Sequence, residues 1–216
     1  MSPRISIPPH YAQRMHILAA TDELLDNVSF EDLTVKAICE KANTTRQTFY
    51  RYFIDKYEIA QWHFNLTAEE GVFEIGRTTN WQGGYLITMG RQYELKDFYH
   101  HVSSSRGYNS IAQYVERARI ANLKETVTEC LKEELDEELQ FQIAATAILE
   151  STLITRWMRD RMPESPQELA SFMMSSVPRR LYDMLNVDSA PQRETPGHTD
   201  PRNSDVQKQR TQFDVH

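Results

Sequence analysis

Apolar residues recur along most of the chain at the spacing of three and four residues that marks one face of an α-helix. Within residues 11–27, for example, Ile17, Leu24 and Leu25 fall on one such face together with Thr21. No segment keeps up the two-residue alternation of a half-buried strand, and the Asn-Gly and Asp-Gly pairs typical of tight hairpins are absent. The pattern therefore predicts an all-α fold.

The same periodicity, with cap residues and breaks, places the individual helices. We expect them at residues 11–27, 35–42, 45–53, 56–78, 81–92, about 95–102, 110–132, 139–162 and 167–185, with a loop at 103–107. Pro178 lies inside the last of these and should kink it. From residue 186 to 216 large apolar residues almost disappear, so this tail is predicted to be disordered.

Charge and cysteine usage narrow the class of protein. The net charge is −7, but residues 1–60 hold seven Lys or Arg against eight Asp or Glu, so the acid excess lies mostly beyond them. Cys39 and Cys130, the two cysteines, suggest neither a disulfide framework nor a zinc site. No apolar run is long enough to span a membrane, and the first residues lack the apolar stretch of a signal peptide. We expect a cytoplasmic protein without a membrane partner.

Residues 35–53 combine a helix, a short turn and a second short helix, which is the helix-turn-helix arrangement of DNA-binding proteins. Asn43 tolerates the left-handed conformation that such a turn needs. The exposed face of the second helix carries side chains suited to double-stranded DNA. Arginine pairs with guanine and glutamine with adenine, and hydroxyl groups reach phosphates. These side chains are Thr45, Arg46, Gln47, Thr48 and Tyr50.

The run from Ala42 to Lys56, Ala-Asn-Thr-Thr-Arg-Gln-Thr-Phe-Tyr-Arg-Tyr-Phe-Ile-Asp-Lys, closely resembles the TetR/AcrR family of bacterial transcriptional regulators. The resemblance extends back through Ile17-Leu18-Ala19-Ala20 and Phe30, and covers about residues 11–60. Two glycines usual in the family are missing, since Ser29 and Asn43 stand at their positions. A run from Trp157 to Leu169 also looks like a C-terminal subgroup of the family.

The resemblance implies three regions: a helix-turn-helix domain at residues 10–58, a helical regulatory and dimerisation domain at 59–185, and the tail at 186–216. Carried over position by position, it makes four residues base-facing, namely Thr45, Arg46, Gln47 and Thr48. It makes four others phosphate-facing, namely Thr34, Tyr50, Tyr52 and Lys56.

In this family the C-terminal helices bind an effector and form the homodimer. Six aromatic or methionine residues of the central helices are expected to line an effector pocket, although ordinary core packing explains any one of them as well: Trp62, Phe73, Trp81, Tyr85, Met89 and Tyr114. Seven residues of the last helices form an expected dimer interface, with packing inside one chain as the alternative: Ala144, Ile148, Ser151, Thr155, Phe172, Val177 and Leu181.

Three functions remain to be compared. The first is a homodimeric repressor of a near-palindromic operator, released by a small-molecule effector of unknown identity. The second is a family-like co-activator or adaptor that works mainly through a protein partner. The third is a small helical enzyme, which is disfavoured because the sequence shows no catalytic grouping of Ser, His, Asp or Cys. No catalytic residue, metal site or cofactor is expected.

Overall fold

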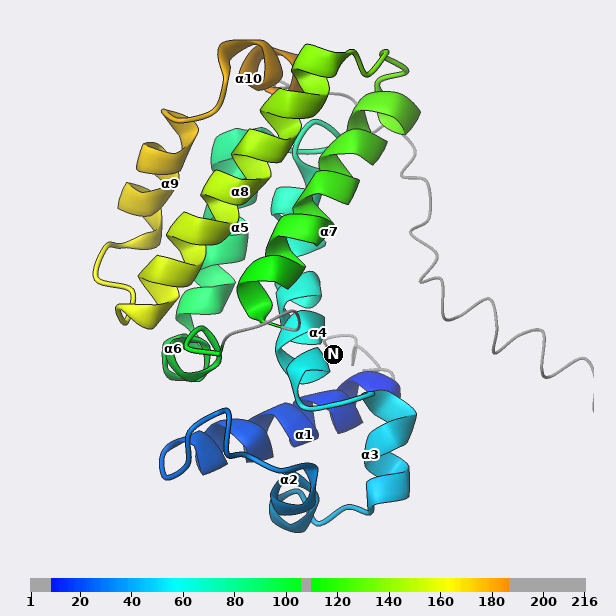
Figure 1. Ribbon diagram of the computed structural model, residues 1–216, viewed down its shortest axis with the longest axis vertical. Helices are drawn as coiled ribbons and strands as arrows, with labels where there is room; N and C mark the ends of the chain where they lie inside the picture. The colour runs from blue at the N-terminus through cyan, green and yellow to red at the C-terminus, as the bar shows by residue number, and fades with distance from the viewer. Residues whose placement is uncertain (1–8, 106–109, 187–216) are drawn as a thin grey trace, which may run out of the picture.

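The computed structural model describes residues 9–105 and 110–186 (Figure 1). Throughout these residues the regular elements are helices, apart from one isolated bridge between Ile75 and Thr79, so the predicted all-α fold is confirmed there. Three helices form an N-terminal unit, and the remaining helices form a larger bundle above it in Figure 1. The predicted disordered tail, except Asn186, lies outside the described residues, as do residues 106–107 of the predicted loop.

The N-terminal unit consists of α1 (Pro9–Leu25), α2 (Val35–Lys41) and α3 (Arg46–Tyr52). The Thr34 hydroxyl caps α2 by accepting a hydrogen bond from the Ala37 amide at 3.1 Å, as its sequence position predicts. The three helices pack around a small apolar core. Its buried members are Ile17, Leu18, Leu25, Phe30, Ile38, Phe49 and Phe53.

The larger bundle begins with α4 (Tyr57–Ala68) and continues through α5 (Trp81–Tyr93), α6 (Lys96–Val102), α7 (Ile111–Glu125) and α8 (Glu137–Arg159). It closes with α9 (Pro166–Met174) and α10 (Arg179–Leu185). A single 3-10 turn (Val72–Glu74) precedes α5, and a π-helical turn (Thr126–Cys130) extends α7. The long helices α7 and α8 pack along each other, while α9 packs against α5.

One expected helix ends early. The sequence pattern predicts a helix over residues 56–78, but α4 stops at Ala68 and the chain turns at Gly71. Gly71 lies so close to α5 that a Cβ placed on it would be 2.8 Å from the Gly84 carbonyl oxygen. The Thr88 hydroxyl then accepts a hydrogen bond from the Val72 amide at 2.9 Å, which replaces the helical partner that amide loses.

The last expected helix is broken instead of kinked. Residues 167–185 form α9 and α10, separated by a link at residues 175–178. Pro178 has no amide hydrogen to continue the ladder of α9, and it stands directly before the first residue of α10. Because α9 ends before Pro178 and α10 begins directly after it, no helical hydrogen bond requires the missing amide hydrogen. The chain changes direction at this link.

Candidate DNA-binding surface

The short helix α3 holds its polar side chains outward through one buried anchor. The Phe49 side chain is fully buried and contacts the Phe53 ring, with ring centroids 5.8 Å apart. On the opposite side Arg46 and Gln47 are exposed, and Tyr50 is 56% exposed. These three predicted DNA-contacting residues therefore share the outer surface of α3, as the amphipathic pattern indicates.

Two threonines at the start of α3 are occupied by local hydrogen bonds. The Thr45 hydroxyl oxygen accepts from the Thr48 amide at 3.0 Å and also lies 3.0 Å from the Thr48 hydroxyl. This cap fixes the first turn of α3, and both side chains stay at the surface, Thr45 exposed and Thr48 half-buried. Their methyl groups and one hydroxyl hydrogen remain available for a base or a phosphate.

The turn between α2 and α3 is built without glycine. Asn43 adopts the left-handed conformation with a φ of 45°, which confirms the conformation expected from its sequence position. The Thr44 amide donates to the Cys39 carbonyl at 2.9 Å, which closes the end of α2. The His16 ring, through Nε2, bonds the Ala42 carbonyl at 2.8 Å, so α1 also holds this end. The end of α2 is therefore held both by the turn and by α1.

Lys56 faces the protein in this structure. Its ammonium donates hydrogen bonds to three backbone carbonyls, those of Phe30 at 2.7 Å, Glu31 at 2.6 Å and Leu33 at 2.9 Å. The same nitrogen lies 5.4 Å from the ring centroids of Phe30 and Tyr57. Three carbonyls use all three ammonium donors, so the arrangement is that of a clamp and differs from the expected phosphate contact.

The other two expected phosphate-facing residues lie at the edges of this surface. Thr34 is exposed, with its hydroxyl oxygen engaged in the cap of α2. Tyr52 is half-buried, and its ring centroid lies 5.9 Å from that of His10 in α1. Its partial burial favours packing over the expected phosphate contact.

The expected effector-pocket residues do not all line the cavity between α5, α8 and α9. Trp81, Tyr85 and Met89 are fully buried in α5, with the Trp81 and Tyr85 rings in contact, whereas Phe73 and Tyr114 both pack against Phe64. Trp62 packs against Phe53 and Tyr11 between the two units of the fold. Of the six, Tyr85 alone lines the cavity between α5, α8 and α9 described below. The others fill core positions, which is the alternative explanation of an aromatic stripe.

A buried ion pair between Arg119 and Glu150, which was not expected from the sequence, adjoins that cavity. Arg119 and Glu150 are 1% and 4% exposed, and the Arg119 Nε donates to the Glu150 Oε2 at 2.8 Å. The Tyr85 hydroxyl donates to the Glu150 Oε1 at 2.5 Å. Burial, followed by the Glu150 charge, raises the pKa of Tyr85 well above its ordinary value, so Tyr85 stays a donor. The sequence does hold a signal that Arg119 is buried, because Arg119 lies on the same face of its helix as the apolar residues Val115 and Leu123.

The expected dimer-interface residues separate into three groups by exposure. Ile148 and Phe172 are 49% and 59% exposed, and Phe141 and Leu149 beside them on α8 are exposed too. Ser151 and Leu181 are instead buried within the chain, 3% and 0% exposed, so they are no part of an outer surface. Ala144, Thr155 and Val177 are half-buried. We call the exposed set Phe141, Ile148, Leu149 and Phe172 the α8–α9 face.

Two further features bear on the class of protein. Within residues 9–105 and 110–186, no group of three or more His, Cys, Asp or Glu side chains is arranged to hold a metal ion. In the same residues no helix combines the length and the apolar character that crossing a membrane requires.

Comparison with known families agrees with the geometry. The profile of bacterial regulatory proteins of the tetR family matches residues 17–61, and that of a transcriptional regulator C-terminal region matches residues 79–178. Together they span about two thirds of the chain. No curated protein matches the chain.

Two solved structures are similar in fold. The dihydroxyacetone kinase operon activator DhaS is 17% identical, with a TM-score of 0.56 over 81% of this chain and 98% of its own. A TetR-family transcriptional regulator from Streptomyces coelicolor is 22% identical, with a TM-score of 0.42 over 76% of this chain and 99% of its own. From the helix-turn-helix geometry and the two profiles, the chain belongs to the TetR family of DNA-binding transcriptional regulators.

Proposed function

We propose that this regulator is a homodimeric repressor that binds a near-palindromic operator through α3 and is released by a small-molecule effector. The observation that carries the DNA-binding part is the outward set of Arg46, Gln47 and Tyr50 on a helix that Phe49 anchors and Thr45 caps. Arginine and glutamine are the side chains best suited to two-point recognition of guanine and adenine in the major groove.

The α8–α9 face supports the homodimer. Three large apolar side chains of α8 and Phe172 of α9 are exposed on neighbouring helices, and such a patch on a soluble chain marks a contact surface. A two-fold axis through this face would place two copies of α3 on one side of the dimer. Dimers of this kind read half-sites about 34–36 Å apart, one turn of DNA, which is why the operator should be near-palindromic.

Selection of binding sites from random double-stranded DNA, using the purified full chain, tests the proposal. We expect enrichment of a near-palindrome whose half-sites are about one helical turn apart. Equal, salt-dependent binding to every sequence would contradict a specific operator. Enrichment of a single half-site without a partner would contradict the dimer.

Action through a protein partner, as a co-activator or adaptor, is the second candidate. The observation that favours it is the fold shared with a protein named as an operon activator. The two candidates differ in the order of events at a promoter. A repressor alone should block transcription in a purified system, whereas an activator should leave basal transcription intact or raise it.

A further inference from the structure

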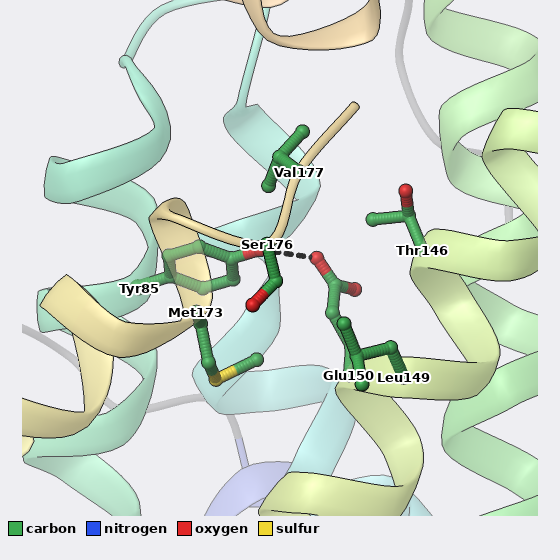
Figure 2. Close-up of a pocket in the computed structure, with 7 residues that line it drawn as sticks. All are labelled: Tyr85, Thr146, Leu149, Glu150, Met173, Ser176 and Val177. Atoms are coloured by element: carbon green, nitrogen blue, oxygen red, sulfur yellow. Dashed lines mark hydrogen bonds between the residues drawn. The ribbon is translucent and has the colours of Figure 1, made fainter. Parts of the chain in front are cut away.

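A small cavity lies where α5, α8 and α9 meet, against the 175–178 link (Figure 2). Its empty space amounts to about 180 Å³, part of it open to solvent, and leaves room for little more than one water molecule at its centre. Figure 2 shows the Tyr85 hydroxyl and the Glu150 carboxylate facing each other at this space. The lining residues are Tyr85, Thr146, Leu149, Glu150, Met173, Ser176 and Val177.

Two polar groups of the cavity have unused hydrogen-bonding capacity. A carboxylate has about four acceptor positions, and those of Glu150 receive one hydrogen bond from Tyr85 and two from Arg119, the weaker at 3.4 Å. At least one acceptor position of Glu150 is left over. The Thr146 hydroxyl lines the same space, is buried, and has no hydrogen-bond partner within the described part of the chain, so it can donate one hydrogen bond and also accept one. Glu150 therefore favours a ligand that donates, and a ligand hydroxyl, which both donates and accepts, suits Thr146 as well.

The charge of the cavity is already balanced. Glu150 forms a buried ion pair with Arg119, and Arg119 is further held by the Val72 carbonyl at 2.6 Å and the Asn122 side-chain oxygen at 2.6 Å. An additional cation would lose its hydration without finding an unpaired anion, and an anion would face the Glu150 carboxylate directly. A neutral donor avoids both costs. Of the remaining lining residues, Leu149, Met173 and Val177 are apolar, and the Ser176 hydroxyl donates to the Phe172 carbonyl at 3.2 Å.

We propose that this cavity binds a small neutral molecule with a hydroxyl group on a short apolar skeleton, the hydroxyl donating to Glu150. A molecule larger than water needs the 175–178 link to move outward. This link is the movable wall, because Pro178 interrupts the helical hydrogen bonds there, whereas α5 and α8 are continuous helices.

The position of the cavity relates the ligand to regulation. Leu149 lines the cavity and also belongs to the α8–α9 face, and Met173 is the neighbour of Phe172 in α9. Displacement of α9 by a ligand would therefore move the face through which we propose that two copies pair. In calling such a ligand an effector the inference rests on the proposed function, but binding itself is measured without DNA.

Three probes with one skeleton separate the ligand classes: 2-methylpropan-1-ol, 2-methylpropylammonium and 2-methylpropanoate. The full chain is labelled with ¹³C at its methionine methyl groups, and each probe is titrated while the Met173 signal is followed. The Met15 signal in α1 is the internal control. We expect a saturable shift of Met173 with the alcohol alone. Absence of a saturable shift, or an equal or tighter response to the ammonium or carboxylate probe, would overturn the proposal.

Occluding variants locate the binding. Val177→Phe fills the cavity from the link, and Leu149→Phe fills it from α8. If one of these variants does not fold, the other still provides the test. Each should weaken alcohol binding at least about ten-fold, the loss expected when a ligand must displace a side chain. Thr152→Phe puts the same ring on an exposed position of α8 outside both the lining and the link, and should leave binding within about two-fold. Unchanged binding in folded Val177→Phe and Leu149→Phe proteins would overturn the proposal.

Measuring operator binding with the same preparations separates a failure of the proposed function from a failure of the cavity site. A protein that binds the alcohol but no specific DNA contradicts the proposed function and leaves the cavity site standing. A protein that binds its operator but never the alcohol contradicts the cavity site alone.

Discussion

The Lys56 ammonium donates a hydrogen bond to the Leu33 carbonyl at 2.9 Å, and so joins the corner between α3 and α4 to the loop between α1 and α2. The same nitrogen reaches two more carbonyls of that loop. The Asp55 carboxylate next to it accepts from the Glu58 amide at 2.9 Å, and the Glu58 carboxylate accepts from the Ile54 amide at 2.5 Å. The exit from α3 is therefore held by side chains on both sides of Lys56.

We expect Lys56→Met to lower the free energy of unfolding by about 1–3 kcal/mol, since hydrogen bonds from a charged donor to three carbonyls are lost. DNA binding should weaken because α3 is held less firmly, while the slope of log affinity against log salt stays the same. Urea unfolding and salt titrations measure the two effects. A phosphate contact would instead reduce that slope by about one.

Lys36→Met is the control for the clamp. Lys36 lies on α2 in the same unit and makes only an exposed pair with Glu40 at 3.7 Å. Its replacement should change the free energy of unfolding by less than about 0.5 kcal/mol. A loss as small for Lys56→Met would show that the three carbonyl contacts do not stabilise the domain.

For Arg46→Ala we expect a loss of about 1–3 kcal/mol in operator binding, with relaxed preference at one base pair, because the arginine fork reads a base edge. Arg46→Lys keeps the charge but not the two-point geometry, so it should lose the preference while largely keeping the salt dependence. Binding to the selected operator and to single-base variants measures both. An unchanged base preference in both variants would remove Arg46 from the base-reading set.

The local structure of the candidate DNA-binding surface was largely predictable because its signals are local. Thr34 and Thr45 cap the helices that follow them, and Asn43 takes the left-handed conformation its type tolerates. Each depends on a few neighbouring residues. Lys56 was expected at a phosphate from the family resemblance, and only the folded loop reveals three carbonyls within its reach.

The larger bundle was less predictable because its decisive contacts join distant segments. The early end of α4 depends on Gly71 meeting α5 and on the Thr88 hydroxyl replacing a helical partner. Arg119 and Glu150 lie 31 positions apart, and nothing in the spacing of either shows that they pair. Six residues were expected to line an effector pocket, but of these Tyr85 alone lines the cavity. The pattern cannot separate the two roles, because aromatic side chains that fill a core and those that line a pocket recur along a helix at the same spacing.

The α8–α9 face gives a direct test of association. Ile148→Glu places a charge on the α8–α9 face and should disfavour its burial against a second copy. We expect light scattering to show the mass of a dimer for the natural chain and about 25.3 kDa for the variant. Ile87→Glu, at a 39% exposed position of α5, is the matched control and should leave the dimer intact. A dimer that survives Ile148→Glu would place the interface elsewhere.

Removing one partner of the buried Arg119–Glu150 ion pair should lower the free energy of unfolding more than replacing both partners by apolar residues. Glu150→Leu leaves the Arg119 charge buried without its carboxylate, so we expect a loss of about 3–5 kcal/mol in the free energy of unfolding. The double change Arg119→Met/Glu150→Leu removes more atoms but no longer buries a lone charge, and it should cost less. Breaking the exposed pair Arg179–Asp183 should lower the free energy of unfolding far less, because solvent screens both charges. A double variant less stable than Glu150→Leu would contradict this reasoning.

His63 predicts how stability depends on pH. Burial lowers the pKa of His63 to about 4, and its ring bonds the Tyr99 hydroxyl at 2.7 Å between α4 and α6. An unfolded histidine titrates near 6.5, so the unfolded chain takes up this proton first as the pH falls. The stabilisation is therefore complete above about pH 6.5 and is lost between about pH 6.5 and 4, by up to about 3 kcal/mol.

Replacing His63 by glutamine isolates this contribution from the carboxylates that titrate in the same range. The variant should be less stable than the natural chain at pH 7, because it loses the packing of the ring. Its unfolding free energy should fall less steeply than that of the natural chain between pH 6.5 and 4.5, since no buried imidazole remains to be protonated. Urea unfolding at half-unit pH steps gives both curves. Parallel curves would mean that His63 titrates alike in the folded and unfolded chain, and that its burial does not restrain its protonation.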